Sequence, residues 1–144
     1  MKKILIPIEF DTVSRHALRY AIDLIAGQGK YTLLHVIDDS SLRIDEAKRH
    51  LREFWESAWT IPCSGHVDFL VIQGDVVDII LGQTGKTTYD YIVMGTRENH
   101  DVLDRWFGTT ANNVARRSPV PVLLVPAEAV FCGFKQVLIA SDYH

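Results

Sequence analysis

A polar segment between two apolar runs carries the residue types of a phosphate site. The apolar run Tyr91–Met94 ends at Gly95, a polar loop follows, and Gly108-Thr109-Thr110 opens a helical pattern. Glycine lets the backbone approach a ligand closely, and the free N–H groups at the start of a helix attract phosphate. The segment therefore predicts an anion-binding corner.

One carboxylate in this loop works against a phosphate. Glu98 stands where a second glycine would serve the site better, because glutamate adopts positive φ only at a cost and adds a like charge. At ~4 Å and an effective dielectric constant of ~20, two unit charges repel by roughly 4 kcal/mol. That repulsion is worth about three powers of ten in affinity. Arg97, His100 and Arg105 could offset part of it, and a solvated loop without a ligand is the alternative reading of these three.

Composition sets the class of protein. The chain has 144 residues, of which 47% are hydrophobic, so it suits one domain with a real core. The net charge of −3 comes without a basic block, which argues against a nucleic-acid partner. Cys63 and Cys132 have neither disulfide-motif nor zinc-ligand spacing. No stretch reads as a signal peptide or as a membrane span of ~20 residues, so we expect a cytoplasmic protein without a membrane partner.

Apolar periodicities place strands and helices alternately along the chain. The expected strands are Lys3–Ile8, Tyr31–Ile37, Val67–Ile72, Tyr91–Met94 and Val120–Val125. The expected helices are Val13–Ala26, a helix capped within Asp38–Ser41 that runs to about Trp59, a helix from Gly74-Asp75 through Leu81, and Thr109–Arg117. The segment Gly82–Thr88 superficially resembles a phosphate loop, but its position favours a glycine stop for the third helix.

Strands alternating with helices predict right-handed crossovers between parallel strands. The fold class is therefore α/β, an open five-stranded parallel sheet with helices on both faces. Ligands of such sheets bind at the carboxyl ends of the strands, where the strand order reverses. The loops after Ile8, Ile37, Ile72 and Gly95 are the candidates.

The end of the chain repeats its beginning. Lys135–Tyr143 echoes Lys2–Phe10, so the tail reads as the first strand of a second copy of the domain. A chance likeness between two short apolar strands is the alternative. The chain then divides into a domain over residues 1–127 and a tail over residues 128–144. We expect Lys135–Ala140 to add a strand at a sheet edge, within this chain or on a partner chain.

These elements, in this order, resemble the universal stress protein family up to Val125. The resemblance rests on Ile4-Leu5-Ile6-Pro7-Ile8 before an acidic residue, Leu33-Leu34-His35-Val36, Gly74-Asp75, Tyr91-Ile92-Val93-Met94-Gly95-Thr96, Gly108-Thr109, and Ser118-Pro119-Val120-Pro121-Val122-Leu123-Leu124-Val125. No piece is specific alone, but their combined spacing is. The resemblance implies the adenine nucleotide alpha hydrolase-like fold and a homodimer formed through the last strand, Val120–Val125.

Nucleotide-binding members of that family carry Gly-x-x-Gly, nine residues, then Gly-Ser or Gly-Thr. On this chain the first glycine is Gly95 and the last pair is Gly108-Thr109, but the middle glycine falls on Glu98, so the motif is broken. An aspartate used near the adenosine falls on Glu9. By resemblance, adenine would lie against Pro7, Val36 and Met94, and phosphates near Gly95, Gly108, Thr109 and Thr110.

Three functions are consistent with these residues. The first is a non-catalytic, homodimeric stress-response module with a degenerate adenine-nucleotide pocket, which needs no cofactor and binds ATP or another adenine nucleotide weakly. The second is an ATP-binding switch with slow hydrolysis, in which Glu98 points away from the phosphates. The third is an interaction protein without a ligand. No catalytic set is recognisable, and we read Asp11 as a helix cap beside a lone Glu9 rather than as half of a metal pair.

Overall fold

The computed structural model describes residues 1–37, 43–58, 64–97 and 108–139. Five parallel strands form one sheet in the order β3-β2-β1-β4-β5, as the α/β prediction requires. The strands are β1 (Lys3–Pro7), β2 (Lys30–Ile37), β3 (His66–Gln73), β4 (Tyr91–Thr96) and β5 (Val122–Pro126). The helices are α1 (Thr12–Leu24), α2 (Ile44–Ser57), α3 (Val76–Lys86) and α4 (Thr109–Arg117).

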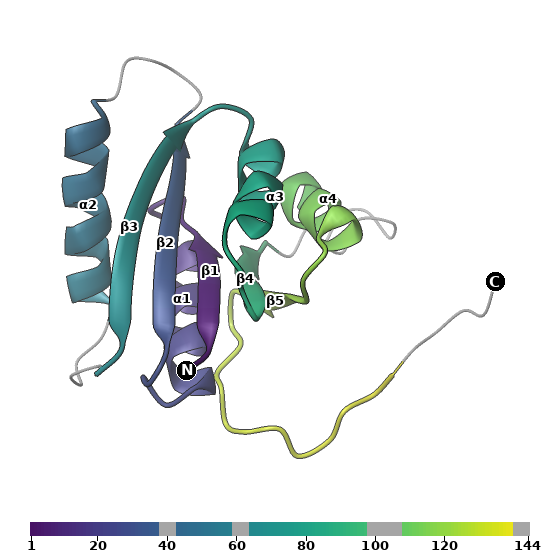
Figure 1. The fold of residues 1–144 in the computed structure, drawn as a ribbon. Coiled ribbons are helices and arrows are strands. Elements are labelled where there is room, and N and C mark those ends of the chain that lie inside the picture. Colours follow the sequence, from purple (N-terminus) through teal and green to yellow (C-terminus); the bar gives the residue numbers. More distant parts are fainter. Residues whose placement is uncertain (38–42, 59–63, 98–107, 140–144) are drawn as a thin grey trace.

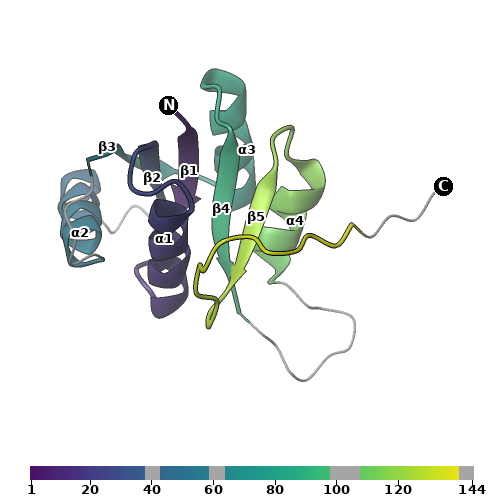
Figure 2. The ribbon, with the colours of Figure 1, turned by 90° about the horizontal axis from the view of Figure 1, so that it is seen from below.

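Helices cover both faces of the sheet, and each face buries its own apolar layer (Figures 1 and 2). Side chains alternate along a strand, so Ile4 and Ile6 of β1 pack under α1 and α2 while Leu5 packs under α3. The strand order reverses between β1 and β4, since β2 lies on one side of β1 and β4 on the other. Parallel-sheet ligand sites form at such a reversal.

Capping residues fix the starts of two helices. Asp11 accepts a hydrogen bond from the Ser14 backbone N–H at 2.8 Å, which confirms it as the cap of α1, and Asp75 caps α3 in the same way. The cap of α2 was predicted wrongly. This helix begins at Ile44 after Arg43, whose side chain makes no capping hydrogen bond. The predicted cap residues, 38–41, all lie outside the described residues.

The glycine stop predicted for α3 is also wrong. Gly82 and Gly85 both lie inside the helix, which continues to Lys86. A helical glycine costs about 1 kcal/mol relative to alanine but keeps the backbone geometry, so neighbouring residues can carry the helix through it. The chain leaves the helix at Thr87, whose backbone is extended.

The last strand lies at one edge of the sheet, and the tail does not form the predicted added strand within the described residues of this chain. β5 is an edge strand, and Val122, Leu123 and Leu124 are only half-buried, because no further strand in the described part of the chain covers that side. After Pro126 the chain first packs against the domain, where Ala129 meets the core and Phe131 contacts Tyr20 of α1, and residues 135–139 then extend away from it (Figure 1). Residues 135–139 form no strand in this chain, and Leu138 is 93% exposed. Pairing of the tail within the chain is thus not found in the described residues; pairing with a second chain stays a prediction.

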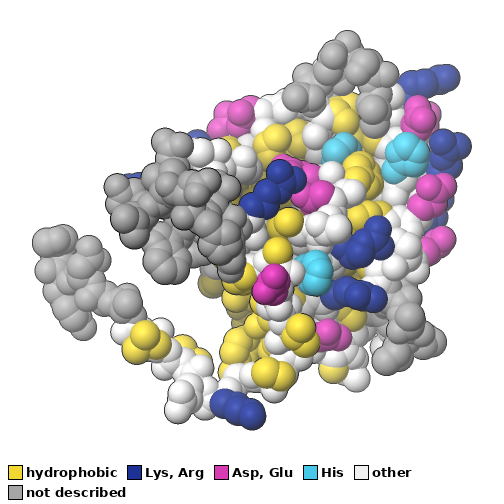
Figure 3. Space-filling model, turned by 180° about the vertical axis from the view of Figure 1, so that it is seen from behind, with side chains coloured by type: hydrophobic (Ala, Val, Ile, Leu, Met, Phe, Trp, Pro, Cys, Tyr) yellow, Lys and Arg dark blue, Asp and Glu magenta, His cyan; other side chains and the backbone are white. Residues whose placement is uncertain are grey.

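The exterior carries no block of one charge on the side of α1 and α2. Figure 3 shows basic and acidic side chains interspersed there. Of the helices that the structure describes, none combines the length and apolar character needed to cross a bilayer.

Candidate functional site

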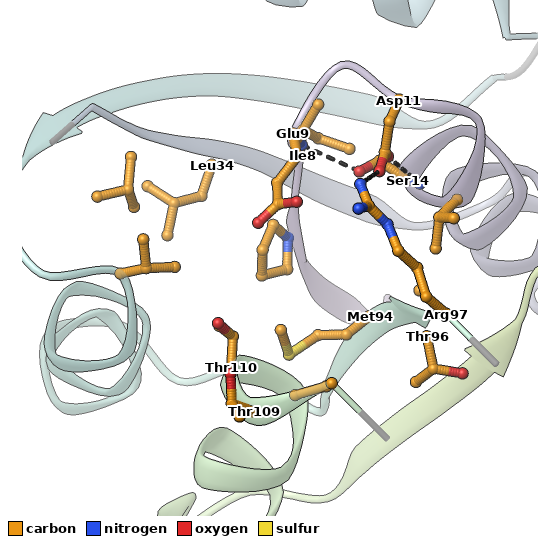
Figure 4. Close-up of a pocket in the computed structure, with 17 residues that line it drawn as sticks. Ile8, Glu9, Asp11, Ser14, Leu34, Met94, Thr96, Arg97, Thr109 and Thr110 are labelled. Carbon is orange, nitrogen blue, oxygen red and sulfur yellow. Dashed lines mark hydrogen bonds and ion pairs between the residues drawn. The ribbon is translucent and has the colours of Figure 1, made fainter. Parts of the chain in front are cut away.

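A cavity of about 330 Å³ opens at the carboxyl ends of β1 and β4, where the strand order reverses (Figure 4). Its floor comes from the sheet, and its walls come from the loop after β1 and the start of α4. All the predicted binding residues that the structure describes line it: Pro7, Glu9, Val36, Met94, Gly95, Arg97, Gly108, Thr109 and Thr110. Glu98 lies outside the described residues. The structure therefore brings the predicted set together, although their contact with a ligand stays a prediction.

Apolar side chains from three strands make up the inner surface of the cavity. Pro7, Val36 and Met94 were expected to hold adenine, and Leu34 and Val76 extend the same surface. Leu34 is fully buried and Met94 nearly so. A mostly apolar cavity with few polar groups is the usual form of a small-molecule site. This surface suits a flat, weakly polar ring.

Hydrogen bonds hold the loop after β1 in place. The Ile8 N–H donates to the Leu34 carbonyl at 2.8 Å, and the Ile8 carbonyl lies 2.8 Å from Nδ1 of His35. The His35 side chain is half-buried and its Nδ1 makes this hydrogen bond. The Glu9 N–H donates to Oγ of Ser14 at 3.0 Å. The backbone of Glu9 is thereby fixed, and its carboxylate points into the cavity (Figure 4).

Arg97 forms an ion pair with a carboxylate of the same chain. Its Nη2 lies 2.6 Å from Oδ2 of Asp11, while the other oxygen of Asp11 caps α1 (Figure 4). The hydrogen bond to Asp11, with the charges of Asp11 and Glu9, raises the pKa of Arg97. Partial burial would raise the pKa of Asp11, but hydrogen bonds from Arg97 and Ser14 outweigh it and hold that pKa below its ordinary 3.8. A phosphate would have to compete with Asp11 for this guanidinium.

This ion pair makes the free energy of unfolding depend on pH. The pKa of Asp11 is lower in the folded chain than in the unfolded chain, so the ionised carboxylate stabilises the fold above the unfolded pKa. The contribution is lost as pH falls through the folded pKa. We expect Asp11→Asn, which can still cap α1, to be less stable than wild type near pH 7 and to match it once the pH is well below about 3. Urea unfolding across that range measures the difference; a gap that does not change with pH would contradict this role.

The start of α4 faces the cavity without a side-chain cap. Gly108 precedes the helix, and the first intrahelical bond runs from the Asn112 N–H to the Gly108 carbonyl at 3.0 Å. Helix geometry thus leaves the N–H groups of the first turn without an intrahelical acceptor. A side chain added at Gly108 would meet no described atom within 4 Å. The helix start can therefore receive an anion.

Gly95 has a packing role that the sequence does not reveal. A Cβ at this position would lie 2.5 Å from Cγ1 and 2.7 Å from the carbonyl oxygen of Val13. The end of β4 therefore rests directly on the first turn of α1. The φ of Gly95 is not in the left-handed region, so close approach explains this glycine. The prediction that it serves a phosphate is untested.

Acidic groups outnumber basic ones among the described residues that line the cavity. Glu9 and Asp11 contribute two carboxylates and Arg97 contributes one guanidinium, which leaves a net charge of −1. Within the described part of the chain, no three His, Cys, Asp or Glu side chains gather as metal ligands. The cavity thus combines an apolar floor and a helix N-terminus with an unfavourable charge for a polyphosphate.

Comparisons with known proteins agree with this fold. A family model described as the universal stress protein family matches residues 1–126. No curated protein matches the chain. Among solved structures, hypothetical protein MJ0577 superposes with a TM-score of 0.70 at 23% identity, covering 90% of this chain and 98% of that one.

Two further solved structures are of proteins described with a nucleotide. A universal stress protein in complex with cAMP has a TM-score of 0.66 and 20% identity, over 88% of this chain and 98% of its own. A universal stress protein family protein from Arabidopsis thaliana with AMP bound has a TM-score of 0.62 and 16% identity, over 88% of this chain and 92% of its own. At these identities the three likenesses establish the fold.

Proposed function

Because the chain belongs to the universal stress protein family, we propose that it is a non-catalytic stress-response module with a weakened adenine-nucleotide pocket. The observation that carries this proposal is the ion pair between Arg97 and Asp11. Arg97 is the only cation among the described cavity residues, and Asp11 already binds it. Glu9 adds a second carboxylate to the cavity. An adenine ring can pack against the apolar floor, but each added phosphate is repelled by the net negative charge of the cavity.

Two of the related structures support an adenine nucleotide with one phosphate as the ligand class, since those proteins are described with cAMP and with AMP. The start of α4 gives one phosphate an N-terminal helix site. We propose that Pro7, Val36 and Met94 contact the adenine and that Gly108, Thr109 and Thr110 contact the phosphate. We also propose that Glu9 accepts hydrogen bonds from the ribose hydroxyls.

An ATP-binding switch with slow hydrolysis is the second candidate. The open helix start beside Gly108 favours it, because nothing among the described residues fills that space. Mass spectrometry of ligand released from the purified protein separates the two. We expect no ATP to survive purification, because the negative cavity holds the triphosphate weakly. Bound ATP at near-equal ratio to the chain would favour the switch. Absence of any adenine-nucleotide binding would favour an interaction protein.

We further propose that β5 joins two copies of the chain into a homodimer in the cytoplasm. β5 is an edge strand with half-buried apolar side chains, and such an edge readily pairs with another strand. The exposed apolar tail residues Val137, Leu138 and Ile139 offer a second strand for the same assembly. Sedimentation equilibrium is expected to give twice the mass of one chain, and a monomer at all concentrations would contradict the proposal.

A further inference from the structure

A second cavity lies at the opposite end of the sheet from the nucleotide pocket. Its volume of about 510 Å³ is within the range of small-molecule sites. It is bounded by the first residues of β1, β2 and β3 and by the last turn of α3; we call it the amino-end cavity. The residues that give it its chemistry are Lys3, Lys30, Thr32, Asp68, Gln83 and Lys86.

Two nearly buried polar side chains line the amino-end cavity. Thr32 is 4% exposed and Gln83 is 7% exposed. In the described residues, no hydrogen bond involves the hydroxyl of Thr32 or the side-chain amide of Gln83. Neither side chain is among the described residues with a fully buried, unpartnered polar atom, so their polar atoms are accessible from the cavity. Both groups can therefore hydrogen-bond to a ligand that enters it.

The charges of the amino-end cavity are mostly positive. Lys3 and Lys30 are register neighbours on adjacent strands, so their side chains project from the same face of the sheet. Lys86 adds a third cation from α3. Asp68 is the single carboxylate among the lining residues, and it pairs with Lys30 at 3.0 Å. Among the described residues, Lys3 and Lys86 have no ion-pair partner. The positive charges of Lys3 and Lys30 lie side by side on the sheet and therefore repel each other.

We propose that the amino-end cavity binds a small organic anion with several carboxylate or phosphate oxygens. Lys3 and Lys86 would hold the anionic groups, and Thr32 and Gln83 would hydrogen-bond to the oxygens that enter the cavity. The ligand differs from that of the nucleotide pocket, where the described lining residues carry net negative charge. The two sites lie at opposite ends of the strands, so each can be occupied without the other.

Titration of ¹⁵N-labelled full-length protein with citrate, and separately with inorganic phosphate, tests this site by NMR at low salt. We expect saturable shifts at the amides of Thr32, Gln83 and Lys86 with at least one of the two anions. Lys3→Met and Lys86→Met should each weaken binding by about fivefold or more, because each removes one charge contact. Lys48→Met is the matched control: this exposed lysine lies on α2, across the sheet, and its loss should change nothing at the site.

Gln83→Met separates a ligand-binding amide from a structural one. Methionine keeps the length and apolar stem of glutamine, so the melting temperature should stay the same or rise while anion binding weakens by about fivefold or more. A lower melting temperature with unchanged anion binding would assign the amide to the fold and overturn the proposal. So would the lack of saturable shifts with both anions. Saturation by citrate alone or by phosphate alone supports the site and identifies which anionic group it prefers.

Discussion

Replacing Gly95 by alanine is expected to destabilise the domain by about 2–3 kcal/mol, because the added methyl group has no space. It would lie 2.5 Å from Cγ1 of Val13 and 2.7 Å from the Val13 carbonyl oxygen. The side chain of Val13 could rotate, but the carbonyl belongs to the first turn of α1 and moves only if the helix moves. Urea unfolding of wild type and variant measures the loss.

Gly82→Ala is the matched control for this substitution. Gly82 is exposed inside α3, and a Cβ there would meet nothing within 4 Å. Alanine should therefore stabilise the domain by about 0.5–1 kcal/mol through helix propensity. If the two variants changed the free energy of unfolding alike, the contact between β4 and α1 could not be the reason for glycine at position 95.

The order of strands and helices could be predicted from the sequence because it depends on local patterns. Apolar runs and three-four spacing predicted each strand and helix that the structure describes. Gly108-Thr109 marked the start of α4 correctly. The gathering of Pro7, Val36, Met94 and the α4 start around one cavity followed from the family resemblance and from parallel-sheet topology. These features need no knowledge of which side chains meet across the fold.

Contacts between distant residues could not be predicted in the same way. The sequence suggested Arg97 as a phosphate ligand, yet the structure pairs it with Asp11, 86 residues earlier. The packing of Gly95 on Val13 has no local signature either. Leu34, by contrast, was missed although it precedes Val36 by two residues on the same strand, and strand alternation would have placed both on one face.

Glu98→Gly is expected to strengthen ATP binding by about two to three powers of ten. The substitution restores the broken glycine motif and removes a carboxylate from the loop that follows Arg97, whose neighbours already carry net negative charge. Glu98→Gln separates the two effects, because it removes the charge and keeps the side chain. It should recover only part of the gain. Glu128→Gln removes the same charge at an exposed position outside the cavity and should leave ATP binding unchanged.

The most direct test is calorimetric titration of ATP into the wild-type chain and into Glu98→Gly under identical buffer and salt. The weakened-pocket account predicts weak or undetectable heat for wild type and clear, saturable binding for the variant. Tight ATP binding by wild type, left unchanged by the substitution, would contradict it.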